Sequence, residues 1–239
     1  MNDNYVDELW NKKNSIIRSD IIVNPVLEEL LKNVHQKRVV DLGCGSGNLT
    51  EICAKKGANI VGIDRETKWF PQTPHKNASY QQGNVCDLPF ENAYFDTAYV
   101  ALSYLHLTND ELTKSVKEVY RVLRPNASFI IADVHPTALI QSKTPSLVKH
   151  NNRGINYFES REVSAKLYTI SGSSVQINYV HRSLSDYLNI LTKSGFDISS
   201  VIEPKPTQEQ ISTYPNLLNV ETTQPSYIIF NLKKGEQNE

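Results

Sequence analysis

One segment near the start of the chain constrains the fold more than any other: residues 39–50, which read VVDLGCGSGNLT. A short apolar run ends in an acid, three glycines follow at alternate positions, and a helix-like run comes next. Glycines at this spacing let the backbone turn sharply and keep side chains out from between the main chain and a ligand. The segment therefore predicts a strand, a tight loop and a helix around a cofactor, with four candidate cofactor-binding residues: Asp41, Gly43, Gly45 and Gly47.

The position of the third glycine bears on which cofactor fits this loop. The dinucleotide fingerprint G-x-G-x-x-G would need a glycine at position 48, where this chain has Asn48. The pattern found here, D-x-G-x-G-x-G, resembles motif I of the class I methyltransferases that depend on S-adenosylmethionine (SAM). The resemblance implies SAM as the cofactor and a Rossmann-like fold. A nicotinamide-linked enzyme stays an alternative.

The rest of the chain alternates between strand and helix patterns. We expect strands over Arg38–Leu42, Asn59–Ile63, Ser79–Gln82, Phe95–Ala101, Ser128–Val134, Phe196–Ile202 and Ser226–Leu232, and helices over Leu49–Lys56, Leu112–Leu123 and Leu184–Ser194. Such alternation predicts an α/β fold with a doubly wound sheet and right-handed crossovers. Only a loop is expected between the last two strands, so they should pair antiparallel. A seven-stranded, mostly parallel sheet with an antiparallel last strand is also what the methyltransferase resemblance implies.

The 239 residues suffice for one large domain, and we expect a single methyltransferase domain over 1–239. Its parts are an N-terminal helical cap (1–36), a SAM-binding core (37–135), an insertion after the fifth strand (136–182) and the C-terminal part of the sheet (183–233). The insertion contains two strand-like runs around the turn SGSS, which predict a β-hairpin. We interpret it as a β-rich lid over the substrate.

The overall charge limits the choice of partners. The 25 Lys and Arg residues nearly balance the 26 Asp and Glu residues, whereas nucleic-acid binders usually carry a basic surface that neutralises phosphates. No apolar run is long enough to span a bilayer, and three cysteines are too few for a disulfide framework or a zinc site. We therefore expect a cytoplasmic protein, monomer or homodimer, with a small-molecule acceptor, no nucleic acid, no membrane and no metal.

A second acid follows the second predicted strand. Asp64 lies 23 positions after Asp41, and the carboxyl ends of adjacent parallel strands meet at the edge of the sheet where ligands bind. A carboxylate there can accept both hydroxyls of a ribose. We expect Asp64 and its neighbour Arg65 to contact the adenosine part of the cofactor.

The next segment, QGNVCDLPF at 82–90, resembles the "G-D-x-x-x-L-P-F" segment of the type 11 small-molecule methyltransferases related to ubiquinone biosynthesis. The resemblance implies that the residue after the glycine lies near the adenine amino group and that the following amide meets the ring. Here these are Asn84, whose side-chain oxygen can accept from an amine, and Val85. The resemblance also implies that Ala101 allows close approach of the cofactor, and we add Arg18 of the cap to the cofactor-binding residues.

Methyl transfer from a sulfonium needs alignment of the acceptor and, for some acceptors, a general base. The string "HP…YVHRSLSDYLN…GF…EP", from position 135 onward, resembles a subgroup of small-molecule methyltransferases. We predict His135 and His181 as catalytic residues, and Trp10, Tyr157 and His106 as substrate-binding residues. The alternative for each histidine is a structural role, with His181 capping the following helix or holding the lid down.

The predicted function is metal-independent transfer of a methyl group to O, N or S of a small organic acceptor. Two alternatives use the same fold: an RNA or protein methyltransferase, and a SAM-binding protein without turnover.

Overall fold

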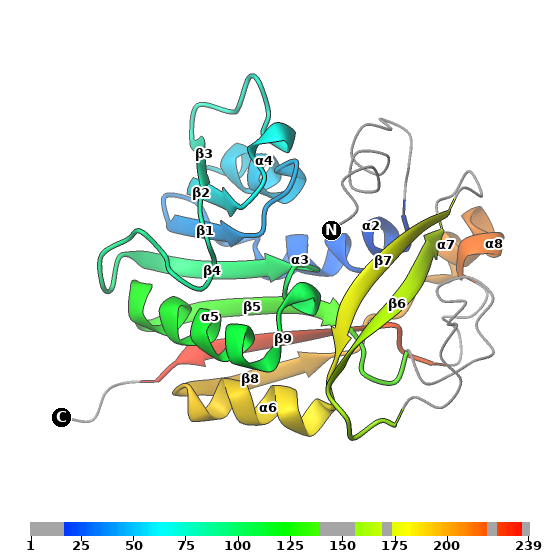
Figure 1. The fold of residues 1–239 in the computed structure, drawn as a ribbon. Helices are drawn as coiled ribbons and strands as arrows, with labels where there is room; N and C mark the ends of the chain where they lie inside the picture. Colours follow the sequence, from blue (N-terminus) through cyan, green and yellow to red (C-terminus); the bar gives the residue numbers. More distant parts are fainter. Residues whose placement is uncertain (1–16, 139–155, 169–173, 219–223, 236–239) are drawn as a thin grey trace.

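The computed structural model describes residues 17–138, 156–168, 174–218 and 224–235. Its main feature is a seven-stranded sheet in the order β3-β2-β1-β4-β5-β9-β8 (Figure 1). The strands are β1 (Arg38–Leu42), β2 (Asn59–Asp64), β3 (Ala78–Gln82), β4 (Phe95–Ala101), β5 (Leu123–Val134), β8 (Phe196–Ile202) and β9 (Tyr227–Lys234). Strands β1 to β5 pair parallel, and β9 runs antiparallel to both β5 and β8. The predicted mostly parallel sheet with an antiparallel last strand is confirmed.

Helices cover both faces of this sheet. On one face α5 (Asn109–Val122) and α6 (Leu184–Lys193) pack in a core that includes Phe129 and Phe230. On the other face α2 (Arg18–Ile22), α3 (Asn24–Leu30) and α4 (Asn48–Lys55) pack around a second core. The side chains of β1 alternate between the two cores, as the period of two of a strand requires. The sheet is therefore doubly wound.

The predicted hairpin of the insertion forms a separate two-stranded sheet. Strands β6 (Arg161–Tyr168) and β7 (Ser174–His181) pair antiparallel. The hairpin crosses the carboxyl ends of β4 and β5 (Figure 1) and contacts the short 3-10 helix η2 (Tyr104–His106) that follows β4. A small apolar cluster of Leu105, Val163 and Tyr179 lies at this contact. The position agrees with the lid that the sequence predicts.

The structure corrects the connection between the last two strands of the main sheet. The sequence predicts a loop, but two helices lie there: α7 (Gln208–Thr213) and α8 (Pro215–Leu218). Thr207 caps α7 by accepting from Gln210 N, and the Gln210 side chain donates to Ile21 O at 2.7 Å. The helix is thus fixed by a partner 189 residues away in the chain.

A second difference from the sequence-based expectation lies at the start of β5, which the sequence predicts to begin at Ser128. The structure also has a short 3-10 helix after β2, η1 (Thr67–Trp69). Strand β5 begins at Leu123, directly after α5, and its pairing with β4 shifts register between Phe95 and Thr97. Asn126 has a φ of 63° there, as expected for a residue type that tolerates the left-handed region. Asn126 therefore lies at an irregularity within β5.

Candidate functional site

The glycine loop leaves β1 at the carboxyl edge of the sheet. Gly43, Gly45 and Gly47 have φ values of 72°, 52° and 75°, in the left-handed region that favours glycine. A Cβ on Gly43 would lie 2.0 Å from Ser103 Oγ, and one on Gly47 would lie 2.2 Å from the Tyr80 hydroxyl. Larger residues would therefore clash with the loops after β4 and with β3. The loop places a bare backbone at the start of α4.

Asp64 connects this loop to the end of β2. Its carboxylate accepts the Gly45 N–H at 2.8 Å through Oδ2 and the Glu66 N–H at 2.9 Å through Oδ1. A carboxylate offers about four lone-pair sites, so each oxygen of Asp64 can accept one more donor. The two oxygens are thus oriented by backbone groups and still suited to a pair of hydroxyls.

Asp41 lies beneath the loop rather than in front of it. The side chain is buried, and its Oδ2 accepts from Thr50 Oγ1 at 2.6 Å and from the Tyr99 hydroxyl at 2.7 Å. Burial raises the pKa of Asp41 to about 6, although both hydroxyl donors oppose the shift. The residue thereby joins the end of β1 to α4 and β4, and it supports the loop from below.

Asn84 follows β3 next to Asp64, because the Gly83 N–H donates to Asp64 O at 2.9 Å. Its side-chain Oδ1 accepts from Cys86 N at 3.0 Å and from Arg65 Nη2 at 3.2 Å. The oxygen that we expected to accept from an adenine amine therefore already has two donors. Val85, the next residue, is buried.

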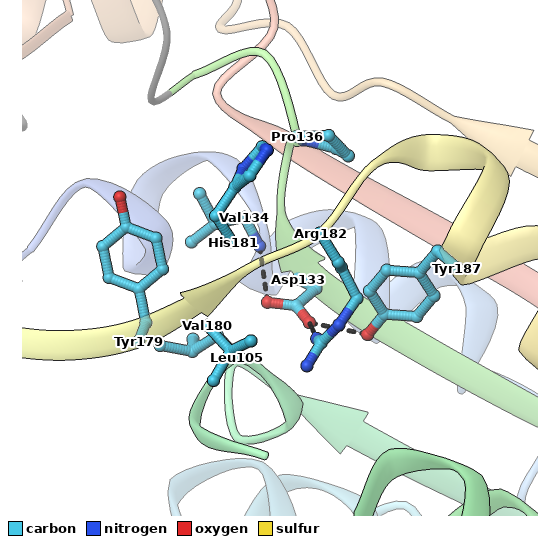
Figure 2. A pocket seen from close by; sticks show the side chains of 9 residues that line it. All are labelled: Leu105, Asp133, Val134, Pro136, Tyr179, Val180, His181, Arg182 and Tyr187. Atoms are coloured by element: carbon cyan, nitrogen blue, oxygen red, sulfur yellow. Dashed lines mark hydrogen bonds and ion pairs between the residues drawn. The ribbon is translucent and has the colours of Figure 1, made fainter. Parts of the chain in front are cut away.

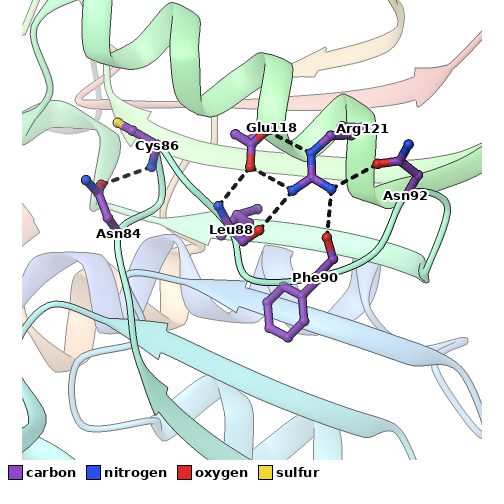
Figure 3. Close-up of polar contacts among 7 residues, drawn as sticks. All are labelled: Asn84, Cys86, Leu88, Phe90, Asn92, Glu118 and Arg121. Atoms are coloured by element: carbon purple, nitrogen blue, oxygen red, sulfur yellow. Dashed lines mark hydrogen bonds and ion pairs between the residues drawn. The ribbon is translucent and has the colours of Figure 1, made fainter.

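Helix α5 holds the segment that follows Asn84 (Figure 3). Glu118 accepts the Leu88 N–H at 2.8 Å, and Arg121 donates to the Leu88 and Phe90 carbonyls at 2.9 and 2.7 Å. Arg121 also donates to Asn92 Oδ1 at 3.0 Å. Sequence reasoning did not identify Glu118 and Arg121, although their i, i+3 spacing on a helix is typical of an ion pair.

The segment after β4 carries His106 on η2. Its Nδ1 lies 2.9 Å from Asn178 O on β7, so Nδ1 carries the proton, because a carbonyl only accepts. No hydrogen bond to its Nε2 is found among the described residues. Desolvation by the surrounding chain lowers the pKa of His106, although the residue keeps access to solvent. The imidazole is thereby held neutral with a free lone pair. Ala101 ends β4 two residues before Ser103.

Arg182 anchors the hairpin to the main sheet (Figure 2). The buried guanidinium donates to Tyr104 O at 3.3 Å, to Leu107 O and to Asn109 Oδ1 at 3.1 Å. It also lies 4.0 Å from Asp133 Oδ2, which accepts from the Tyr187 hydroxyl at 2.6 Å. Burial raises the pKa of Asp133, while Arg182 and Tyr187 oppose the shift. A small cavity lies against this network, with Val134, Pro136, Tyr179 and His181 in its wall.

Both predicted catalytic histidines are buried and hydrogen-bonded. His135 Nε2 lies 3.0 Å from Glu203 Oε1, and Nδ1 accepts the Thr137 N–H at 3.2 Å and contacts Thr137 Oγ1 at 2.7 Å. Burial lowers the pKa of His135, and Glu203 opposes that shift. His181 Nε2 donates to Tyr157 O at 3.0 Å, and burial lowers its pKa. His135 thus connects the ends of β5 and β8.

Comparison with known proteins fits this geometry. Residues 40–131 match the family model described as "Methyltransferase domain". The chain is 25% identical to a putative S-adenosylmethionine dependent methyltransferase from Listeria monocytogenes, whose crystal structure it matches with a TM-score of 0.70 over 89% of this chain and 96% of that one. The chain carries a class I methyltransferase domain.

Curated relatives match the methyltransferase domain over part of their length. An uncharacterized methyltransferase of Synechocystis sp. is 35% identical over 46% of this chain and 52% of the relative. A 2-phytyl-1,4-naphtoquinone methyltransferase of Nostoc sp. is 33% identical over 40% of this chain and 46% of the relative. The chain thus spans about half the length of the curated relatives it matches.

Three predicted residues remain to be placed around the methyltransferase domain. Arg18 is buried on α2. The Tyr157 hydroxyl accepts the Leu184 N–H at 3.0 Å, at the start of α6. Trp10 lies outside the described residues. Within the described ranges, no three His, Cys, Asp or Glu residues are grouped as a metal site would need, and no helix there is long and apolar enough to span a membrane.

Proposed function

We propose that this protein transfers a methyl group from SAM to O, N or S of a small organic acceptor. The observation that carries the proposal is the contact of the glycine loop with Asp64, whose carboxylate accepts the Gly45 N–H at 2.8 Å. A bare backbone and an oriented carboxylate side by side, at the carboxyl edge of a parallel sheet, suit a ribose with a chain attached. The methyltransferase domain supports SAM as that ligand.

The residues present fit the cofactor in a definite order along the sheet edge. Gly43, Gly45 and Gly47 would lie against the amino-acid part, and Asp64 would accept the ribose hydroxyls. Asn84 and Val85, one strand further out, would meet the base. Bound SAM supplies an electrophilic methyl group, so the protein has to position the acceptor and exclude water. The proposed cofactor-binding set is completed by Asp41, Ala101, Arg18 and Arg65.

The acceptor would lie between the end of β4 and the hairpin. Where the acceptor must lose a proton, His106 offers Nε2 as a base, because Asn178 O fixes the tautomer. The proposed catalytic role of His135 would require its contact with Thr137 or Glu203 to open during turnover. In the described part of the chain His181 Nδ1 has no hydrogen-bond partner, but it is buried, so a catalytic role would require it to become accessible. Tyr157 and Trp10 stay proposed substrate contacts.

The remaining features of the protein are proposals as well. The naphthoquinone methyltransferase among the relatives supports a small-molecule acceptor, and the net charge of −1 argues against an RNA substrate. We further propose one domain over residues 1–239, a cytoplasmic location, a monomer or homodimer and no metal requirement. An RNA or protein substrate, or SAM binding without turnover, are the alternatives.

Titration calorimetry with S-adenosylhomocysteine tests the cofactor assignment without knowledge of the acceptor. Asp64→Ala should weaken binding by about 1–3 kcal/mol, because the ribose hydroxyls lose a charged acceptor. Glu91→Ala, which removes an exposed carboxylate in the loop before β4, should leave the affinity unchanged. Absence of binding by the unmodified protein would refute the assignment, and an unchanged Kd in Asp64→Ala would refute the role of Asp64.

A further inference from the structure

The strand order fixes where the purine of the proposed cofactor lies. The glycine loop follows β1, Asp64 ends β2, and Asn84 comes two residues after β3, which is the outer strand on this side. Three hydrogen bonds join the ends of β2 and β3. Gly83 N–H donates to Asp64 O at 2.9 Å, Gln82 Nε2 to Arg65 O at 3.0 Å, and Arg65 Nη2 to Asn84 Oδ1 at 3.2 Å. A nucleoside whose ribose lies on Asp64 therefore places its base at Asn84. This placement rests on the proposed function.

The orientation of the Asn84 amide follows from its partners. Cys86 N–H at 3.0 Å and Arg65 Nη2 at 3.2 Å both donate to the same side-chain atom. Only the oxygen of the amide can accept two donors, so this atom is Oδ1. The opposite orientation would place the NH₂ group, itself a donor, against the donors of Cys86 and Arg65. Both lone pairs of the oxygen are then used. What remains for a ligand is Nδ2, which only donates.

The loop around Asn84 has little freedom to change this arrangement. A Cβ on Gly83 would lie 3.0 Å from Ile63 Cγ2, so the chain passes close to β2 at this point. Further along, Glu118 and Arg121 of α5 bind the backbone at Leu88 and Phe90 (Figure 3). The segment is therefore fixed on both sides of Asn84, which favours the orientation in which Oδ1 accepts from Cys86 and Arg65.

We propose that Asn84 recognises the purine as a hydrogen-bond donor, so that binding does not require the 6-amino group. Adenine offers an acceptor at N1 and a donor at its 6-amino group, whereas hypoxanthine offers an acceptor at O6. The Nδ2 of Asn84 can donate to N1 of the first or to O6 of the second. Arg65, the other polar side chain on Asn84 here, is also a donor only. The site accordingly tolerates a 6-oxo purine in place of adenine.

Asn84→Asp should create a preference for adenine while it keeps the local structure. A carboxylate still accepts from Cys86 N–H and Arg65, and its second oxygen now faces the base as an acceptor. That oxygen accepts from the 6-amino group and is repelled by O6. Asn92→Asp is the matched control, because it adds the same charge in the same segment and can still accept from Arg121, as Asn92 Oδ1 does at 3.0 Å.

Titration calorimetry with S-adenosylhomocysteine and with S-inosylhomocysteine, its 6-oxo analogue, measures the preference directly. The unmodified protein and Asn92→Asp should bind both ligands with Kd values within about tenfold of each other, and Asn84→Asp should shift the ratio about tenfold or more toward the adenine form. A larger preference for adenine in the unmodified protein would overturn the inference and indicate an acceptor such as Gln82 Oε1. An unshifted ratio in Asn84→Asp would overturn it as well.

The two proposals fail in distinguishable ways. If neither nucleoside binds, the cofactor assignment falls and the inference about Asn84 falls with it. If S-adenosylhomocysteine binds and its 6-oxo analogue is rejected, only the inference is overturned. Asp64→Ala serves as a reference here, because both ligands share the ribose and should lose affinity by the same factor.

Discussion

Replacing Arg182 by methionine should cost more stability than any other single change at the hairpin. Arg182 is buried, lies 4.0 Å from Asp133 Oδ2 and donates to two backbone carbonyls and to Asn109. Methionine fills much of the same space but leaves Asp133 as a buried charge without a cationic partner. Breaking a buried pair from one side costs about 3–5 kcal/mol. We expect Arg182→Met to lower the free energy of unfolding by about 4 kcal/mol at neutral pH.

Urea unfolding of single and double variants tests this magnitude. In Arg182→Met/Asp133→Asn the orphan charge is gone, and the Tyr187 hydroxyl can still donate to the amide oxygen. The double variant should therefore lose less stability than the sum of the two single variants, with a coupling of about 1–3 kcal/mol. The control is Arg124→Met, because the ion pair of Arg124 with Asp96 is partly exposed and should contribute about 1 kcal/mol or less.

Two results would contradict the reasoning. A loss in Arg182→Met no larger than in Arg124→Met would mean that the buried pair adds no more than a surface pair. Additive losses in the double variant would mean that the cost comes from the carbonyls of Tyr104 and Leu107 rather than from Asp133. Hydrogen exchange offers a second measurement, since amides of β6 and β7 should exchange faster once the anchor is removed.

Two further changes test the loop support and the end of β5. Burial raises the pKa of Asp41 from 3.8 to about 6. Between about pH 4 and pH 6 the folded protein therefore binds more protons than the unfolded chain, so its stability falls as the pH rises. The stability contributed by protonated Asp41 is complete below about pH 4 and lost above about pH 6. Relative to Asp41→Asn, the unmodified protein should thus lose up to about 3 kcal/mol between pH 4 and 7, and a difference independent of pH in urea unfolding would exclude the shift. His135→Ala should lower turnover but keep the Kd for S-adenosylhomocysteine within about threefold, because β1 and β4 separate its strand from β2; a collapse of binding would instead assign His135 to the cofactor site.

The sequence predicts three strands of the main sheet well because their signal is local. The bounds of β1, β4 and β8 agree with those expected, since each is a short run rich in apolar or β-branched residues between polar turns. The sequence predicts the glycine loop equally well, because its three glycines lie next to one another in the chain, between a strand and a helix. Asp64 followed from its place after the next strand.

What the sequence did not reveal depends on partners far along the chain. Helix α7 has the capping pattern T-x-x-Q, but its position relies on Gln210 reaching Ile21 O. The direction of the Asn84 amide depends on Arg65, and the burial of Arg182 depends on carbonyls more than 70 residues earlier. Such contacts are decided by tertiary packing, and no periodicity in the sequence encodes them.

The place of β9 in the sheet has a consequence for the order in which the chain becomes complete. β9 lies between β5 and β8, and it follows both of them in the chain. During synthesis, the edges of β5 and β8 that pair with β9 stay unpaired until β9 has been made. Unpaired strand edges can pair with other chains. Lys234, which ends β9, also donates to Tyr120 O and Leu123 O at the end of α5. Protein halted before this strand should therefore be the species most prone to aggregate.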